Sequence, residues 1–208
     1  MAEHAEVPAS EPKAPAIPFR QIRAHYDDKT ITVYQAYSAE IATAAVSAQR
    51  LTASPAFKRG RMTWIKPSWC WMMYRAGYSH KDSRQSRILA LRMAHADFIS
   101  LLRRAALTHG DQRGEGDVRV QWDPERGPWL DKREYRSIQI GIPGGLSGQW
   151  AEEWIVGIED VTEKARELKR VVDEEDGITE QELVRRGLVP VEREFPVPDD
   201  VREKLRMS

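Results

Sequence analysis

Residues 61–77 read RMTWIKPSWCWMMYRAG, and no other stretch of the chain gathers so many bulky side chains. It holds three of the seven tryptophans, two adjacent methionines and the single cysteine. Aromatic and methionine side chains bury large areas, so such a density is typical of the centre of a core or the wall of a pocket. We therefore expect the rest of the chain to be organised around this segment.

The segment predicts a strand followed by a short buried helix. Residues 61–66 predict a strand, with Met62, Trp64 and Lys66 on one face and Thr63 and Ile65 on the other. Pro67 ends that strand, Ser68 can cap a helix, and Gly77 has the place of a left-handed helix end. The helix between them is apolar almost all round, which is the pattern of a buried helix.

Two charges in this segment are not explained by its apolar setting. Lys66 and Arg75 flank the predicted helix, where a buried cation needs a partner or a ligand. The chain carries 32 basic and 32 acidic residues, yet residues 58–92 hold nine Lys or Arg against one acid. From residue 150 onward, acids outnumber bases seventeen to ten. This asymmetry predicts either an anionic ligand at the basic centre or pairing between the two regions.

Length and composition indicate one domain with appendages. A chain of 208 residues can bury a substantial core. Residues 1–18 are rich in Ala, Pro and Glu, which is typical of a disordered leader. We expect an α+β core domain over 19–175 and a peripheral helical extension over 176–208. The core should contain a mixed, mostly antiparallel sheet of about five to six strands with flanking helices.

The expected elements follow from alternation, caps and turn residues. Strand patterns occur at 20–26, 30–37, 61–66, 87–94, 118–122, 137–142 and 154–158. Helical patterns follow Ser38, cover 69–76, run from Asp97 through Leu107 and from about 160 to 173, and follow Thr179. Residues 27–29 predict a hairpin turn, 108–117 a surface loop and 143–145 a turn, while 196–208 form a peripheral helix or a loose end.

Several functional classes leave no trace in the sequence. There is no P-loop, no G-x-G-x-x-G, no G-x-S-x-G and no H-E-x-x-H. The five histidines show no paired spacing, so we expect no metal site. Cys70 is the only cysteine, which excludes an internal disulfide and predicts a small buried thiol. No apolar run reaches the roughly 18 residues of a membrane span and no signal-peptide core is visible, which favours a cytoplasmic protein.

Three further clusters are candidates for chemistry. Arg23 lies on a predicted strand, where it either grips a carboxylate or phosphate or projects from an edge into water. Tyr34 and Gln35 offer an aromatic wall and an amide, or ordinary sheet packing. Asp123 and Glu125 end a strand beside a proline, which places them for catalysis or for a turn closed by an ion pair. A basic polar loop beside the helix, equally well explained as solvated charge, contains Lys81, Arg84, Gln85 and Arg87.

Together these segments resemble a known family. R-Q-I-R-A-x-Y-D-D, V-Y-Q-A-Y, M-T-W-I-K-P-S-W-C-W-M-M-Y-R-A-G and Q-W-D-P-E-R followed by R-S-I-Q-I-G-I are similar to the family catalogued as domain of unknown function 4291. The resemblance runs from about 20 to 172, leaving out the leader and the acidic tail. It implies that the defining motifs include Arg23, Tyr34, Gln35, Trp64, Lys66, Ser68, Trp71, Met72, Tyr74, Arg75, Trp122, Asp123 and Glu125.

Three functions remain open at this level. The leading hypothesis is an enzyme acting on a nucleotide-like anionic ligand, loosely similar to ADP-ribosyltransferases, with NAD as a possible ligand. In it Arg23, Lys66 and Arg75 converge to grip the anion. Trp71 and Tyr74 form walls, and Glu125 with Asp123 supplies acid–base or electrostatic chemistry. The alternatives are a non-catalytic module for RNA or single-stranded DNA, and a structural or partner-binding protein whose tryptophans fill the core.

Overall fold

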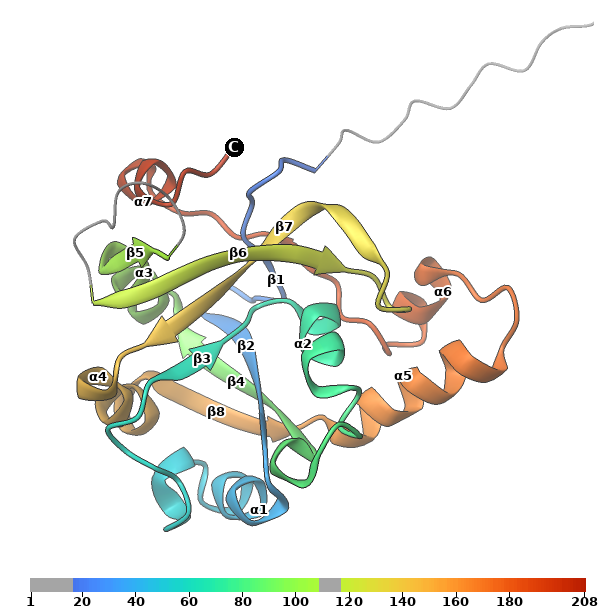
Figure 1. The fold of residues 1–208 in the computed structure, drawn as a ribbon, viewed down its shortest axis with the longest axis horizontal. Coiled ribbons are helices and arrows are strands. Elements are labelled where there is room, and N and C mark those ends of the chain that lie inside the picture. Colours follow the sequence, from blue (N-terminus) through green and yellow to red (C-terminus); the bar gives the residue numbers. More distant parts are fainter. Residues whose placement is uncertain (1–16, 109–116) are drawn as a thin grey trace, which may run out of the picture.

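The computed structural model describes residues 17–108 and 117–208, which form an α+β fold, as expected. The strands make a three-stranded sheet, a four-stranded sheet and a two-stranded ribbon, with helices around them (Figure 1). The sequence analysis expected one sheet, whereas the structure divides the strands. The predicted leader and the predicted loop at 108–117 lie almost wholly outside the described residues.

The three-stranded sheet has the order β2-β4-β8 and is antiparallel. Its strands are β2 (Thr30–Tyr37), β4 (Arg87–Ala94) and β8 (Ile155–Asp160), close to the expected ranges. Residues 31–35 and 88–91 are buried without alternation, because both faces of these strands are covered. The sheet is therefore a central layer.

The four-stranded sheet has the order β3-β7-β6-β5. It contains β3 (Thr63–Ile65), β5 (Ala105–Leu107), β6 (Val118–Arg126) and β7 (Lys132–Ile142). β6 and β7 continue beyond their expected ends into a hairpin closed by the bond from the Gly127 N–H to the Asp131 carbonyl, 2.9 Å. The charged residues of this extension hid its strand pattern.

One predicted helix is wrong at both of its ends. α3 (His95–Arg103) begins two residues before Asp97, which lies in its first turn, and it ends before the expected Leu107. Residues 105–107 instead form β5, parallel to the start of β6. Ala and Leu favour a helix locally, but pairing with 118–120 buries them, and tertiary context overrides propensity.

The remaining helices follow the local signals more closely. α1 is Ala39–Ala48, α2 is Trp69–Ala76, α5 is Thr162–Glu174, α6 is Glu180–Arg185 and α7 is Asp199–Lys204. The Ser68 hydroxyl accepts the Trp71 N–H at 3.1 Å, and Gly77 has φ 54°, so both predicted ends of α2 are confirmed. The expected turn at 143–145 is wrong, because α4 (Gly144–Gln149) starts there and continues as a π-helical turn through Trp154.

The C-terminal segment is part of the core. β9 (Arg193–Glu194) pairs with β1 (Arg23–Ala24). Just after β1, Tyr26 forms an isolated β-bridge with Ile31 of β2. Beyond β9, one residue of the linker and two of the α7 segment are buried in the main core: Phe195, Val201 and Leu205. The extension over 176–208 was expected at the periphery of the fold. In the structure it contributes buried side chains to the main core.

Two apolar clusters place α2 near the middle of the molecule. The main cluster joins one face of each sheet, with members such as Val33 and Leu91 on one sheet and Val120 and Ile140 on the other. The second cluster packs α2 and α5 against the outer face of β2 and β4. α2 also contacts β6, so it touches both sheets (Figure 1).

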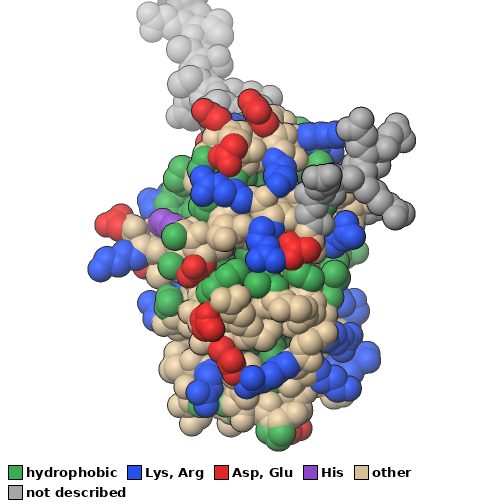
Figure 2. Space-filling model, turned by 90° about the vertical axis from the view of Figure 1, so that its left-hand side faces the viewer, with side chains coloured by type: hydrophobic (Ala, Val, Ile, Leu, Met, Phe, Trp, Pro, Cys, Tyr) green, Lys and Arg blue, Asp and Glu red, His purple; other side chains and the backbone are tan. Residues whose placement is uncertain are grey.

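Surface charge is mixed on the face opposite α5 and α6. Figure 2 shows acidic and basic side chains interspersed over it, in keeping with the equal totals of the sequence. None of the helices built from the described residues has the length and apolar character needed to cross a membrane.

Candidate ligand-binding groove

The site begins with the alternation of β6 and β7. The register pairs Gln121 with Gln139 and Asp123 with Ser137, so their side chains share one face of the sheet. The other face carries Val120, Ile138 and Ile140 into the core. Trp64 and Lys66 lie on the polar face as well, since Ile65 between them is a core residue. A row of polar groups therefore crosses the four-stranded sheet.

A groove of about 840 Å³ opens over this row. One wall comes from β2 and the start of α1, another from 56–64, and a third from α2 and the segment at 84–85. Its lining residues are Tyr34, Gln35, Ala36, Tyr37, Ser38, Ile41, Ala56, Phe57, Lys58, Arg61, Met62, Thr63, Trp64, Lys66, Met72, Arg75, Arg84, Gln85, Gln121 and Gln139. We call this the basic groove.

The lining contains five cations and no carboxylate: Lys58, Arg61, Lys66, Arg75 and Arg84. Arg84 pairs with Asp82 at 3.3 Å, and Lys66 lies 3.7 Å from Asp123 beneath the floor. Among the described residues, no carboxylate lies within ion-pair distance of the other three. Arg75 donates to the Gln85 amide oxygen at 2.8 Å, which leaves its charge unneutralised.

Lys66 forms the floor of the groove and is only 5% exposed. Its ammonium lies 3.1 Å from the centre of the Trp71 ring and donates to the Gln139 amide oxygen. Gln139 in turn donates to Gln121, so the cation anchors an amide chain across the sheet. Burial lowers the pKa of Lys66 well below its ordinary value; Arg75 adds to this, while Asp123 and Glu125 oppose it.

The aromatic and amide residues at the back of the groove hold the two sheets together. The Tyr34 N–H donates to the Lys66 carbonyl at 2.7 Å, and its ring packs edge-on against Trp69 at 5.3 Å. The Gln35 amide donates to the Thr63 hydroxyl at 2.7 Å and to the Trp64 carbonyl at 2.8 Å. These contacts fix the walls independently of any ligand.

Trp64 lies flat across β7 because Gly141 lacks a side chain. A Cβ at Gly141 would come within 2.9 Å of the indole ring. Any larger residue would push the indole outward into the groove. Gly141 therefore sets the depth of this wall.

The N-terminal end of α2 gathers acids instead of cations. The Ser68 hydroxyl donates to Glu125 at 2.8 Å, and Glu125 also accepts the Arg126 N–H at 2.7 Å. The Trp69 N–H donates to Glu192 at 2.6 Å. Burial raises the pKa of Glu125, and burial followed by the Glu125 charge raises that of Glu192 well above its ordinary value. We call Glu125 and Glu192 the acid pair.

A family model described as "Domain of unknown function (DUF4291)" matches residues 21–195. The chain belongs to the DUF4291 family. The match extends beyond residue 172, where the recognisable motifs end, and therefore includes β9 and Glu192. No match was found among curated proteins.

Every residue that lines the basic groove lies within the DUF4291 region. Of the motif residues predicted from sequence, the structure brings six into the lining: Tyr34, Gln35, Trp64, Lys66, Met72 and Arg75. Trp71 and Asp123 lie next to the floor through their contacts with Lys66. Lys66 and Arg75, two of the three cations expected to converge on an anion, therefore line the same groove.

Four other predicted residues lie outside the lining. Arg23 donates to the Glu192 carbonyl at 2.7 Å and to the Gln21 amide oxygen at 3.2 Å. Ser68 and Glu125 are buried at the start of α2. Tyr74 projects outward, with the Arg126 guanidinium 3.8 Å from its ring centre. None of these four side chains lines the basic groove.

Trp122, the last of the predicted residues, borders a smaller cavity together with Asp123. Trp122 and Asp123 line a space of about 340 Å³ at the edge of β6, together with Phe19, Arg20, Leu107, Val120, Gln121 and Arg136. The Trp122 indole N–H donates to the Leu205 carbonyl at 3.1 Å, which ties this edge to the C-terminal segment. Gln121 lines both cavities of the DUF4291 domain.

Sequence reasoning missed Lys58, Arg61, Gln121, Gln139 and Glu192. The two glutamines alternate with apolar residues in predicted strands, so their shared face was a usable signal. Lys58 and Arg61 lie in an irregular segment of the structure, because β3 begins only at Thr63, two residues after the predicted strand start at Arg61. Glu192 lies 124 positions after Ser68 in the numbering, and no local pattern relates them.

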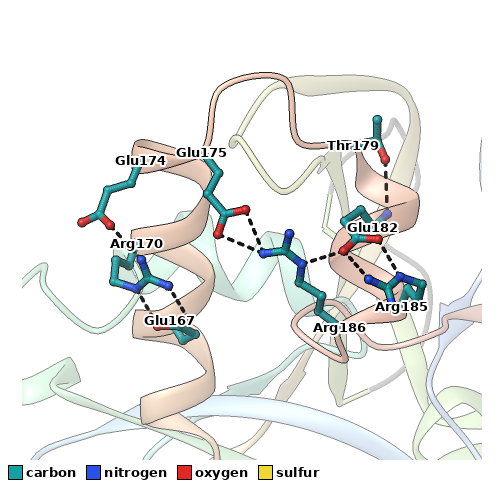
Figure 3. Close-up of polar contacts among 8 residues, drawn as sticks. All are labelled: Glu167, Arg170, Glu174, Glu175, Thr179, Glu182, Arg185 and Arg186. Atoms are coloured by element: carbon teal, nitrogen blue, oxygen red, sulfur yellow. Dashed lines mark hydrogen bonds and ion pairs between the residues drawn. The ribbon is translucent and has the colours of Figure 1, made fainter.

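The acidic C-terminal third neutralises mostly its own arginines. Arg170 binds Glu167 and Glu174, Arg185 binds Glu182, and Arg186 binds Glu175 and Glu182 (Figure 3). Within the described residues, the ion pairs that join this third to residues 58–92 are Arg59 with Glu152 and Arg87 with Asp160. Pairing between the two regions therefore leaves the groove cations largely free.

Proposed function

We propose that the basic groove of this DUF4291 protein binds a nucleotide-like anion. The observation that carries the proposal is its lining of five cations without a carboxylate. Like charges held together repel one another and lose hydration, so such a set is stabilised by an anion that enters between them.

The size and walls of the groove favour a nucleotide over a simple ion. A volume of about 840 Å³ falls among pockets for small organic ligands, which span roughly 300–1,000 Å³. Tyr37, Phe57 and Trp64 line it together with the cations, and aromatic faces stack nucleobases. The basic side chains then match the phosphates, and guanidinium groups bind these in a bidentate manner.

A transferase reaction in the groove would use Asp123 in preference to Glu125. Asp123 lies 3.7 Å from the Lys66 ammonium at the floor. Glu125 is 4% exposed and already accepts hydrogen bonds from Ser68 and Arg126. A group that reacts must reach the bound ligand, and the Asp123 carboxylate is the nearer one.

A thermal-shift series tests the binding. ADP, NAD, inorganic pyrophosphate and a short single-stranded oligonucleotide are added separately, since a ligand at 100 times its Kd stabilises a protein by about 2.7 kcal/mol. We expect ADP or NAD to raise Tm. The double variant Arg61→Gln/Arg75→Gln should lose most of that shift. The variant Arg50→Gln/Lys132→Gln, which removes equal charge from exposed positions outside the lining, should keep it.

Two outcomes would overturn the proposal. A shift by the oligonucleotide alone would favour the nucleic-acid module. An absence of any shift, or an equal loss in both double variants, would leave the cations without a ligand role.

A further inference from the structure

We propose that Lys66 forms a reversible imine with the carbonyl carbon of a phosphorylated aldehyde bound in the basic groove. This inference rests on the proposed function, because it assigns a substrate class to the same site. It accounts for one feature that anion binding alone does not require, namely a lysine at the floor when exposed cations already line the rim.

The surroundings of Lys66 are those of an amine kept available for reaction. Its side chain is buried among Trp71, Gln139 and Asp123, yet it lines the groove. A lysine becomes a nucleophile when it is desolvated or lies near another cation. Both conditions hold, since the residue is 5% exposed and Arg75 lines the same groove. The lowered pKa of Lys66 agrees with this geometry.

The charged groups that face Lys66 come from two elements. On β6, Asp123 lies 3.7 Å away and Glu125 acts at longer range; on α2, Arg75 opposes the protonated form. The two carboxylates and the Trp71 ring favour the ammonium, while burial and Arg75 favour the amine. Burial has the largest effect, so the net change in the Lys66 pKa is downward.

The step balances without a further reactant. The neutral Lys66 nitrogen adds to the aldehyde carbon, and the carbonyl oxygen becomes the hydroxyl of a carbinolamine. Loss of water then forms the C=N bond, and both hydrogens of the amine leave with the oxygen. Proton transfers need a nearby acid–base group. Asp123 qualifies, because its Oδ2 atom has no hydrogen-bond partner among the described residues and is close to the nitrogen.

The rim supplies the preference for a phosphorylated carbonyl compound. Lys58, Arg61 and Arg75 are cations of the lining without an ion-pair partner in the described chain. A phosphate held there would place the rest of a short ligand over the floor. An uncharged aldehyde would lack that anchor.

Reductive trapping tests the proposal. The full chain is incubated with pyridoxal 5′-phosphate near neutral pH and reduced with borohydride, and the modified lysines are mapped by peptide mass spectrometry. We expect Lys66 to be modified faster than the exposed Lys132, because burial favours its reactive amine form. Pyridoxal without its phosphate should modify Lys66 much less.

Variants and a competitor separate this inference from the proposed function. Lys66→Arg keeps a cation at the floor, so ADP binding should persist while trapping at position 66 is lost; Lys132→Arg, at an exposed position outside the lining, should preserve both. Pyrophosphate should protect wild-type Lys66, a result that needs no folded variant. Modification spread over exposed lysines, or equal modification by pyridoxal, would overturn the imine. Failure of ADP and NAD to bind while phosphate-dependent trapping persists would overturn only the nucleotide proposal.

Discussion

The two ends of the α2 region hold their charged side chains in opposite ways. In the basic groove, five cations face an open cavity and most lack a partner. At the start of α2, the acid pair is enclosed and accepts hydrogen bonds from Ser68, Trp69 and Arg126. Charges satisfied by the protein's own donors belong to its architecture, whereas unsatisfied charges beside a cavity are available for a ligand. On this comparison we propose a binding role for the unpaired Arg61 and Arg75 and a supporting role at the start of α2 for Glu125.

The largest effect is expected from Lys66→Met, which removes the cation at the floor of the groove and keeps an apolar side chain of similar length. Hydrogen bonds to charged groups contribute about 1.5–3 kcal/mol, so ADP affinity should fall roughly 10- to 100-fold. Isothermal titration calorimetry measures the change. Lys132→Met, the same substitution on the exposed start of β7, should bind ADP like the wild type. Equal weakening in both variants would contradict a specific role for the floor.

The second prediction concerns Ser68→Ala at the other end. This change removes the N-cap of α2 and the hydroxyl donor of Glu125, and caps contribute about 0.5–2 kcal/mol. We expect a loss near 2 kcal/mol in urea unfolding, with ADP affinity unchanged for the folded protein. Ser38→Ala is the matched control, because Ser38 precedes α1 without making a side-chain cap bond. A large loss of affinity with little loss of stability would place Ser68 in the binding site.

The third prediction uses the raised pKa of Glu192. The folded protein holds the Glu192 proton more tightly than the unfolded chain, in which the glutamate pKa is about 4.5. The stability of the protein therefore declines as the pH rises from 4.5 through the higher pKa of the folded state. Glu192→Gln keeps an acceptor for the Trp69 N–H and removes the repulsion with Glu125. It should therefore be more stable than the wild type at pH 7 and show no gain near pH 4. Urea unfolding at both pH values checks this, and a loss at pH 7 would refute it.

The smallest effect is expected from Arg23→Gln. The sequence analysis placed Arg23 in the anion grip, but its guanidinium binds the Glu192 carbonyl and Gln21. ADP affinity should change by less than about 0.5 kcal/mol, as for substitutions remote from a site. Measured beside Arg75→Gln, which removes the same charge from the groove, this variant decides which arginine contacts the ligand.

Local signals were enough to predict α2 and two of the groove's cations. Pro67, Ser68 and Gly77 mark the element's ends whatever the rest of the chain does. Lys66 and Arg75 stood out because they interrupt an apolar segment. The same reasoning failed at 105–107, where helix-favouring residues form a strand, because their partner lies across a loop in the sequence.

The rest of the site depends on contacts that no local pattern encodes. Lys58 and Arg61 reach the groove from an irregular segment, whose course is set by tertiary packing. The acid pair forms because β6 and the segment before β9 meet at the start of α2. Sequence reasoning gave Glu125 an acid–base or electrostatic role toward a ligand, whereas its actual neighbours are Ser68 and a second glutamate.

The ribbon of β1 and β9 has a consequence for how the protein is made. Arg23 pairs with Glu194, and the Ser208 N–H donates to the Arg20 carbonyl at 3.1 Å. A ribosome releases the N-terminal side of a domain first, and early segments usually begin to fold as they emerge. Here β1 cannot pair with β9 until residues 193–194 have left the exit tunnel. Until then the edge of β1 and the core surface that receives Phe195 stay open to chaperones.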